Sequence, residues 1–552
     1  MPVINFKYSD LCDLLGEKVP QEVLVERIPL IGADMHDTEG GDDDMSVEFF
    51  PDRPDLFSVE GLARALRAFL DIFPGLKTYE ISKGTTTAIV DESVMSVRPS
   101  FSCAIIRDIE VDDDLIRSMM ELQEKLHMTI GRKRNKLAIG IHDLDKVKAP
   151  FTYKAVLPNE VEFIPLASTE VMDLNEILKK HPKGIEYAGL LKGKKKYPVI
   201  TDADNNVLSF PPIINGVLTT VTTNAKNLFI DVTGTDEKAV KGALDIVVTS
   251  LAERGGRIES VNMKGAVSRI SPDLSSQSAS ISVKKAEKFI GVSLGAEGVV
   301  NSLKRMGMDA KVDKQDNVKV HISPTRLDIM HEVDIFEDIA IGYGFERFGG
   351  SYTTTQTTGS LGQDTLFSEK IRDVMVGLGF TEVTTLTLSN EREEFEISCL
   401  PRVENTTILN PITEDHTCLR SYLMPSLMRI LRHNKHRELP QKIFEIGFVA
   451  FEHSTVPHLC ALQTASRTSF TEIKSIAEAI MRESDVKYEI VPCDHKTFID
   501  GRGASIIVNE KEIGVFGEVS PKVITDFEIT HPIIMFEADV SSLIIEKAGR
   551  LF

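Results

Sequence analysis

Apolar residues recur at helical spacing in some segments of the chain and stand in short runs in others. The helical spacing predicts amphipathic helices, and the short runs predict strands. One clear helix follows Ser58, whose side chain can cap its first turn. Its apolar positions are Val59, Leu62, Leu66, Phe69 and Phe73. Because helices and strands are mixed along the chain, the pattern predicts a multidomain α+β protein.

Residues 1–85 are expected to form a mixed α/β N-terminal domain. A strand at residues 3–6 is followed by a short helix that Ser9 can cap, and then by an acidic loop at residues 40–44. The turn Arg53-Pro54-Asp55 precedes the clear helix, and a staple between its arginine and its aspartate would make it rigid.

The remaining chain divides, at changes of pattern, into three further domains and a linker. These are a mixed α/β domain at 86–270, a small α+β domain at 271–347, a Thr/Gly/Ser-rich linker at 348–360, and a domain at 361–552 that combines an antiparallel sheet with flanking helices. In the last domain we expect a Thr-rich strand near 381–388 and a helix with Pro425 in its first turn.

Four polar residues of the middle domain stand at the ends of buried strands or close to a rigid corner. They are Ser209, Asn215, Asp231 and Thr233, with Pro211-Pro212 as the corner. A hairpin around residues 204–206 brings the first two near the corner, and Thr235 or Asp236 can cap the helix that follows the last two. Each residue alone is more typical of a turn or a cap. Together they predict a pocket for a small polar ligand.

The small domain ends in a helix with one acidic face. At helical spacing Asp334, Glu337 and Asp338 share this face, and Asp328 lies just upstream. Four carboxylates that converge repel one another, and a hard divalent cation such as Mg²⁺ relieves the repulsion. The competing interpretation is an ordinary solvated acidic face of an amphipathic helix.

Composition favours a cytoplasmic protein. No run approaches the roughly 18 apolar residues of a membrane span, the first residues lack the pattern of a signal peptide, and the six cysteines have no CxxC spacing. The net charge of −20 is unfavourable for sequence-blind nucleic-acid binding. Any RNA contact must therefore be local, and the candidates are the basic segments 131–136 and 192–196, each of which is also typical of a solvated turn.

Four segments in this order resemble the beta subunit of phenylalanyl-tRNA synthetase of the archaeal and eukaryotic cytosolic type. They are PDRPDLFSVEGLARALR, VLSFPPIIN with LFIDVTGTD, PTRLDIMHEVDIFEDIAIGYGFE, and LNPITEDHTCLRSYLMPSL with KIFEIG. The resemblance implies a partner alpha subunit in an α₂β₂ heterotetramer that uses ATP and Mg²⁺ to ligate L-phenylalanine to tRNA(Phe). It also implies that the middle domain hydrolyses mischarged Tyr-tRNA(Phe).

The resemblance also assigns site residues. The family's Mg²⁺ motif carries over to Asp328, Asp334, Glu337 and Asp338, and its editing motif to Ser209, Asp231 and Thr233, with Asn215 in addition. Tyrosine differs from phenylalanine by one hydroxyl, so the editing pocket needs a polar group that bonds the phenol, and Asp231 or Ser209 can provide it. Thr233 can position water or the ester. No nucleophile has an adjacent base, which favours hydrolysis by a positioned water.

The chain departs from the family in one motif, and it lacks another. Asp52 stands where an Asn is expected before Arg-Pro-Asp; because it lies outside both predicted sites, only the hydrogen bonds of that turn are affected. The last domain resembles a class II synthetase core but has no GxGxxR-type stretch for gripping ATP, so we expect it not to form aminoacyl-adenylate alone. Two alternatives stay open, a metal-dependent hydrolase and a structural, tRNA-binding scaffold with an inert editing site.

Overall fold

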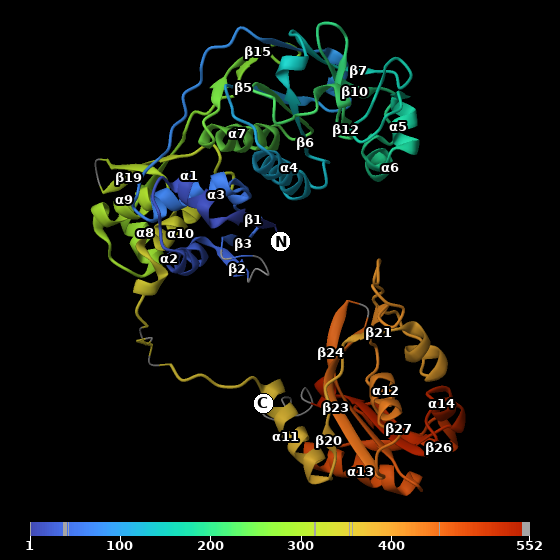
Figure 1. Ribbon diagram of the computed structural model, residues 1–552. Coiled ribbons are helices and arrows are strands. Elements are labelled where there is room, and N and C mark those ends of the chain that lie inside the picture. The colour runs from blue at the N-terminus through green and yellow to red at the C-terminus, as the bar shows by residue number, and fades with distance from the viewer. Residues whose placement is uncertain are drawn as a thin grey trace. The chain divides into compact units, whose positions relative to one another are not determined.

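Helices and strands are mixed throughout the computed structural model, as the sequence predicts (Figure 1). The structure describes residues 2–36, 41, 43–313, 316–350, 352, 354–355, 357–451 and 453–543. Parts of the predicted acidic loop at 40–44 and of the predicted linker at 348–360 lie outside this set. The chain divides into two units, Met1–Tyr352 and Thr353–Phe552. Among the described residues, no helix is both long enough and apolar enough to cross a membrane.

The first unit begins with an antiparallel sheet in the order β1-β3-β2. Its elements are β1 (Val3–Lys7), α1 (Tyr8–Leu15), α2 (Gln21–Arg27), β2 (Ala33–His36), β3 (Asp44–Phe49) and α3 (Val59–Phe69). Ser58 caps α3 as predicted, because its hydroxyl accepts the Gly61 amide at 3.3 Å. Phe73 lies beyond the end of this helix and is 68% exposed. The predicted Ser9 cap is wrong: α1 already begins at Tyr8, and the Ser9 hydroxyl donates to Asp43 instead.

The middle of this unit contains two sheets. The larger has the order β12-β11-β10-β7-β4-β15-β16 and the smaller the order β14-β5-β13-β6. Its main elements are β4 (Thr87–Val90), β5 (Ser100–Arg107), α4 (Asp113–Met128), β6 (Leu137–Asp143), β7 (Phe151–Val156), α5 (Leu174–Lys180), α6 (Pro182–Tyr187), β10 (Tyr197–Thr201), β11 (Val207–Phe210), β12 (Ile214–Asn215), β13 (Leu228–Gly234), α7 (Glu237–Glu253), β14 (Arg257–Glu259), β15 (Val261–Gly265) and β16 (Arg269–Ser271). The predicted hairpin at 204–206 joins β10 to β11, and Asp236 caps α7.

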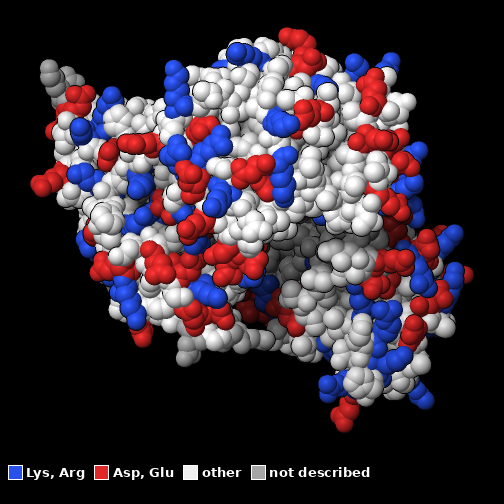
Figure 2. All heavy atoms as spheres, turned by 45° about the horizontal axis from the view of Figure 1, so that its top comes forward, with Lys and Arg blue, Asp and Glu red and all other residues white. Residues whose placement is uncertain are grey.

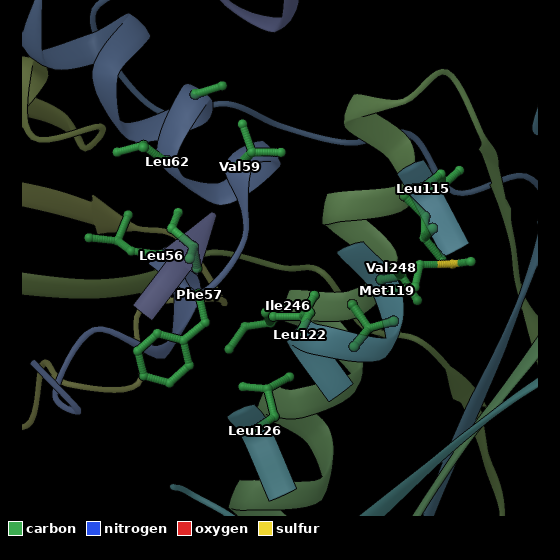
Figure 3. Packing of buried hydrophobic residues seen from close by; sticks show 14 of the residues in the cluster. Leu56, Phe57, Val59, Leu62, Leu115, Met119, Leu122, Leu126, Ile246 and Val248 are labelled. Atoms are coloured by element: carbon green, nitrogen blue, oxygen red, sulfur yellow. The ribbon is translucent and has the colours of Figure 1, made fainter. Parts of the chain in front are cut away.

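One hydrophobic core joins the N-terminal elements to the middle of the unit. Side chains of α4 and α7 pack beside the segment that leads into α3 (Figure 3). Leu122, Leu126 and Ile246 are almost fully buried there, as are Leu56 and Phe57. Fully burying such side chains contributes about 1.5–3 kcal/mol each, which fixes α4 and α7 as a rigid frame for the neighbouring strands.

The last part of the unit packs three helices on a three-stranded sheet. The sheet has the order β17-β19-β18. The elements are β17 (Gln277–Ser282), α8 (Val283–Ile290), α9 (Gly295–Arg305), β18 (Asp309–Val312), β19 (Asn317–Ile322) and α10 (Glu332–Tyr343). Phe336 and Ile339 of α10 face the core of this part, as their helical spacing predicts.

The second unit is an antiparallel sheet flanked by helices, as predicted. Its strand order is β20-β23-β24-β28-β27-β26-β25, and only β20 pairs in parallel among the described strands. The elements are α11 (Gln363–Gly377), β20 (Thr381–Glu382), β21 (Leu388–Ser389), β22 (Cys418–Leu419), α12 (Met424–His433), β23 (Gln441–Phe451), β24 (Ser454–Thr464), α13 (Phe470–Ser484), β25 (Glu489–Pro492), β26 (Phe498–Val508), β27 (Lys511–Val519), α14 (Pro521–Asp526) and β28 (Ile533–Asp539).

Two predictions for the second unit have different outcomes. Pro425 stands in the first turn of α12, as expected. The Thr-rich strand is wrong as a continuous element, because only the two ends of 381–388 pair with neighbours, as β20 and β21. Among the described side chains between them, only Val383 packs against a hydrophobic core, and most of the others are exposed, so the segment gains little from its strand propensity.

Candidate functional site

A cavity of about 680 Å³ lies where α4, β6, β11, β12 and α6 meet. Its wall is mostly apolar and includes Met119, Ile139 and the Pro211-Pro212 corner. Three of the four predicted editing residues line it, namely Ser209, Asn215 and Asp231. We call it the Asp231 cavity.

Asp231 stands on β13 and is 1% exposed. One carboxylate oxygen lies 2.8 Å from Nε2 of His142, and Nδ1 of the same ring lies 2.7 Å from the Thr219 hydroxyl. If the carboxylate accepts from Nε2–H, Nδ1 is left to accept from the hydroxyl. His142 is fully buried between two groups that line the cavity, so it fixes the orientation of both.

Gly140 makes this approach possible. It stands opposite Asp231 in the β13–β6 ladder. A Cβ atom at this position would lie 2.1 Å from the Asp231 Oδ2 and 2.7 Å from the His142 Nε2. Any other residue type would therefore push the carboxylate and the imidazole apart.

Ser209 and Asn215 are paired across the β11–β12 ladder. The Ser209 hydroxyl is buried and has no hydrogen-bond partner among the described residues. An unsatisfied buried hydroxyl costs about 1–3 kcal/mol, so a ligand that bonds to it recovers this free energy. Ser209 and Asp231 thus place two buried polar groups on the wall of a mostly apolar cavity.

Thr233, the fourth predicted editing residue, is not among the residues that line the cavity. Its hydroxyl accepts from Nε of Arg98 at 3.2 Å, and its carbonyl accepts from a terminal nitrogen of the same guanidinium at 3.0 Å. Alternation along β13 puts Thr233 on the same face of the sheet as Asp231, so the cause is its position near the end of the strand, where Arg98 uses its hydroxyl. The strand ends here, and the buried Arg98 holds that end to the turn at residues 134–135.

The remaining wall contains a histidine that stays neutral. Nε2 of His127 accepts the Ile139 amide at 2.8 Å, so this nitrogen cannot carry a proton in the folded chain. Burial lowers the pKa of His127 to about 4. Beside it, Arg134 packs over the Tyr187 ring at 4.4 Å and donates to the Ile213 carbonyl at 2.8 Å, which ties the basic turn to the proline corner.

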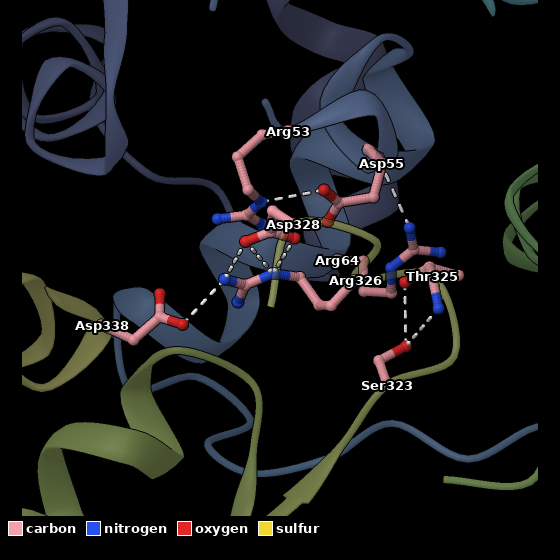
Figure 4. Close-up of polar contacts among 8 residues, drawn as sticks. All are labelled: Arg53, Asp55, Arg64, Ser323, Thr325, Arg326, Asp328 and Asp338. Carbon is pink, nitrogen blue, oxygen red and sulfur yellow. Dashed lines mark hydrogen bonds and ion pairs between the residues drawn. The ribbon is translucent and has the colours of Figure 1, made fainter. Parts of the chain in front are cut away.

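The acidic helix α10 has a different arrangement from the one predicted. The Arg326 guanidinium lies between Asp328 and Asp338, at 2.6 and 2.7 Å (Figure 4). Burial opposes a charge on Arg326, but Asp338 and Asp328 more than offset it, and its pKa lies well above the ordinary value. Asp338 is 2% exposed, so it does not belong to a solvated acidic edge.

The other acidic residues of this helix do not join the pair. One oxygen of Asp334 accepts the amides of Met330 and His331 at 2.7 Å each, which caps the helix. The described residues contain no group of three or more side chains that fits a metal ion. In this arrangement the four carboxylates do not fit Mg²⁺, because an arginine already neutralises two of them and a helix end uses the third. Mg²⁺ at this helix stays a prediction.

Asp52 lies closer to this cluster than the sequence indicated. Burial raises the pKa of Glu337, and the charges of Asp338 and Asp52 raise it further. The charge of Asp52 therefore acts on the acidic helix, while its expected place outside both sites stays a prediction. The turn itself is as predicted, because Arg53 binds Asp55 through two nitrogens at 2.8 and 2.9 Å (Figure 4).

Known proteins match this chain over nearly its whole length. A curated phenylalanine–tRNA ligase beta subunit from Methanosarcina acetivorans is 44% identical over 550 residues, with 99% of this chain and 100% of the relative covered. One from Methanothrix thermoacetophila is 45% identical over 542 residues, with 98% of this chain and 100% of the relative covered. The chain belongs to the phenylalanine–tRNA ligase beta-subunit family.

Family models match three parts of this beta-subunit chain. The B3/4 domain matches residues 106–257, which include the Asp231 cavity. The tRNA synthetase B5 domain matches 279–345, which include α10, and the phenylalanyl-tRNA synthetase beta chain CLM domain matches 351–540. A solved N-terminal fragment of the beta subunit from Pyrococcus horikoshii is similar to the first unit, with a TM-score of 0.60, 38% identity, and coverage of 62% of this chain and 100% of that fragment. As a family member the chain is part of an aminoacyl-tRNA synthetase, a ligase of protein biosynthesis.

Several residues of these sites were not predicted from the sequence. Arg326 stands two residues before Asp328, a spacing that signals a local ion pair. His142 follows the apolar run LAIGI and carries no signal of its own, since a lone histidine after a strand is most often structural. Arg98 has none either, because its contacts depend on a strand far along the chain.

Proposed function

We propose that the Asp231 cavity is a hydrolytic editing site that removes tyrosine from mischarged Tyr-tRNA(Phe), while the chain supports charging of tRNA(Phe) with phenylalanine by an alpha subunit. The observation that carries the proposal is the buried carboxylate of Asp231, together with the unpartnered Ser209 hydroxyl, on the wall of a mostly apolar cavity.

The two amino acids differ by one hydroxyl, and this decides what the cavity must contain. A purely apolar pocket rejects an added hydroxyl by only about a hundredfold, so charging alone leaves errors. A second site that prefers tyrosine needs buried polar groups that lose hydrogen bonds when phenylalanine enters. Asp231 is suited to accept the phenol hydroxyl, and His142 behind it holds the carboxylate in place.

The hydrolytic step is assigned to a positioned water. No serine or cysteine of the described cavity wall is bonded to a base. The Thr219 hydroxyl does lie 2.7 Å from Nδ1 of His142, whose Nε2 lies 2.8 Å from Asp231, so Thr219 is the alternative to water as the attacking group. Ser209 and Thr219 are hydroxyls that can orient a water or the ester carbonyl. Thr233 is assigned a supporting role, because its hydroxyl is used by Arg98.

The experiment compares two reactions of the complex with the alpha subunit. Asp231→Ala removes one hydrogen bond to a charged group, worth about 1.5–3 kcal/mol, so Tyr-tRNA hydrolysis should fall by about 10- to 100-fold in kcat/KM. Charging with phenylalanine should stay unchanged. Asp245→Asn is the matched control, because Asp245 is an equally buried carboxyl of the same domain that does not line the cavity.

Two other results would contradict the proposal. A parallel loss of charging and hydrolysis would make Asp231 a structural residue. Unchanged hydrolysis in the Asp231→Ala and Ser209→Ala variants would place editing elsewhere, and no hydrolysis in the wild-type complex would favour the alternative of a scaffold with an inert site.

The proposed partners follow from the beta-subunit relatives. We infer a cytoplasmic α₂β₂ heterotetramer in which the alpha subunit binds ATP and L-phenylalanine. The absence of a GxGxxR-type stretch in the printed sequence supports this division of labour.

A further inference from the structure

Residues 132–134 form a basic turn directly after α4, at one side of the Asp231 cavity. Arg132, Lys133 and Arg134 have φ values of 46°, 53° and 63°. Left-handed backbone costs about 1–2 kcal/mol per residue for side chains of this kind, so three in succession need compensation from their surroundings.

Buried groups supply that compensation. The guanidinium of Arg98 donates to the carbonyls of Arg134 and Asn135, each at 3.1 Å. The Arg134 amide donates to the His127 carbonyl at 3.2 Å, and its side chain is held at the proline corner. The turn is therefore fixed relative to the cavity, and its conformation does not depend on the other two side chains.

The side chains of Arg132 and Lys133 are exposed to solvent. In the part of the chain that the structure describes, neither forms an ion pair within 4.0 Å, whereas their neighbours Arg134 and Lys136 pair with Glu124 and Asp236. Two free cations thus stand on a rigid turn whose third member lines the cavity.

The negative charge of the whole chain makes these two cations candidates for binding RNA. At −20 the chain repels RNA, and Lys and Arg are interspersed with Asp and Glu over the face seen in Figure 2 rather than gathered in one broad field. A tRNA ester that enters the cavity brings a phosphate with each nucleotide of its single-stranded 3′ end. Local cations beside the mouth are what this strand requires.

We propose that Arg132 and Lys133 bind backbone phosphates of the 3′ end of tRNA and guide the ester into the Asp231 cavity. This inference rests on the proposed editing function. Arg98 and Thr233 act in it as positioning residues, because they fix the turn without touching the RNA.

The test replaces both cations in the full chain, assembled with its alpha subunit. Arg132→Gln with Lys133→Gln removes two single-strand phosphate contacts, so the slope of log(kcat/KM) against log[salt] for Tyr-tRNA hydrolysis should flatten by about 1.4. Between 50 and 200 mM salt the wild type should then lose about sevenfold more kcat/KM than the variant. The double substitution should raise KM for Tyr-tRNA, while kcat and the hydrolysis of tyrosine methyl ester should stay unchanged.

The matched control is Lys192→Gln with Lys195→Gln, which removes the same charge from the other exposed basic segment of this domain. It should leave the salt slope as in the wild type. Equal slopes for the turn variant and the wild type overturn the inference, and so does an equal loss with the methyl ester, which would mean that the turn only shapes the cavity.

A second measurement separates this inference from the proposed editing function. If the wild-type complex hydrolyses neither substrate, the editing function has failed, and the salt dependence of binding to uncharged tRNA then decides. A flatter binding slope for the turn variant alone supports the phosphate contact, and identical slopes refute it.

Discussion

Asp245 offers a prediction whose size can be worked out from the structure. It lies in the middle of α7, is 1% exposed, and one of its carboxyl oxygens has no hydrogen-bond partner among the described residues. Burial raises the pKa of Asp245 to about 8, although the nearby charges of Lys241 and Arg269 act in the opposite direction. The folded chain therefore holds this carboxyl protonated at neutral pH.

The unfolded chain holds it ionised, and this sets the sign of the effect. Between pH 3.8 and pH 8 the unfolded state binds fewer protons than the folded one, so the free energy of unfolding falls as the pH rises. From pH 3.8 to pH 7 the pH rises by about 3 units, and each unit lowers the free energy of unfolding by about 1.4 kcal/mol. The total loss is about 4 kcal/mol. Asp245→Asn cannot ionise and should recover most of this amount at pH 7, and almost none below pH 4.

The assay is urea unfolding of the purified chain at pH 5, 6, 7 and 8, followed by circular dichroism. Amide hydrogen exchange identifies the transition that includes α7. Asp273→Asn is the control, because this carboxyl lies near Asp245 but is exposed and has a lowered pKa of about 2. A constant difference between Asp245→Asn and the wild type across this pH range would refute the reasoning.

Three further predictions concern the other sites. Arg326→Met should lower the free energy of unfolding by about 3–5 kcal/mol, because it leaves the buried Asp338 and the half-buried Asp328 without the guanidinium that pairs with them. Urea unfolding measures this, and a second change, Asp338→Leu, should restore part of the loss. Gly140→Ala should reduce Tyr-tRNA hydrolysis as strongly as Asp231→Ala and leave phenylalanine charging intact, and equal hydrolysis to wild type would disprove the steric argument. The chain without its alpha subunit should give no ATP–pyrophosphate exchange; exchange by the pure chain would contradict the assigned division of labour.

The sequence alone determined the features that depend on neighbours along the chain. The cap at Ser58, the hairpin before β11 and the apolar face of α10 were predicted because spacing and turn chemistry act over only a few residues. The family was also visible, because four motifs stand in order over nearly the whole chain. Ser209 and Asp231 were expected in one pocket, and the cavity brings them together.

Only the tertiary structure decided what the site residues touch. Asp231 and His142 are 89 residues apart and Thr233 and Arg98 are 135 apart, so no spacing rule connects them. The acidic helix shows a similar limit. The spacing of Arg326 and Asp328 signals a local pair, but only the fold brings the same guanidinium to Asp338, which is 12 residues away. Charge patterns give the residues that need a partner, and the packing of distant segments in a low-dielectric interior selects which partner they receive.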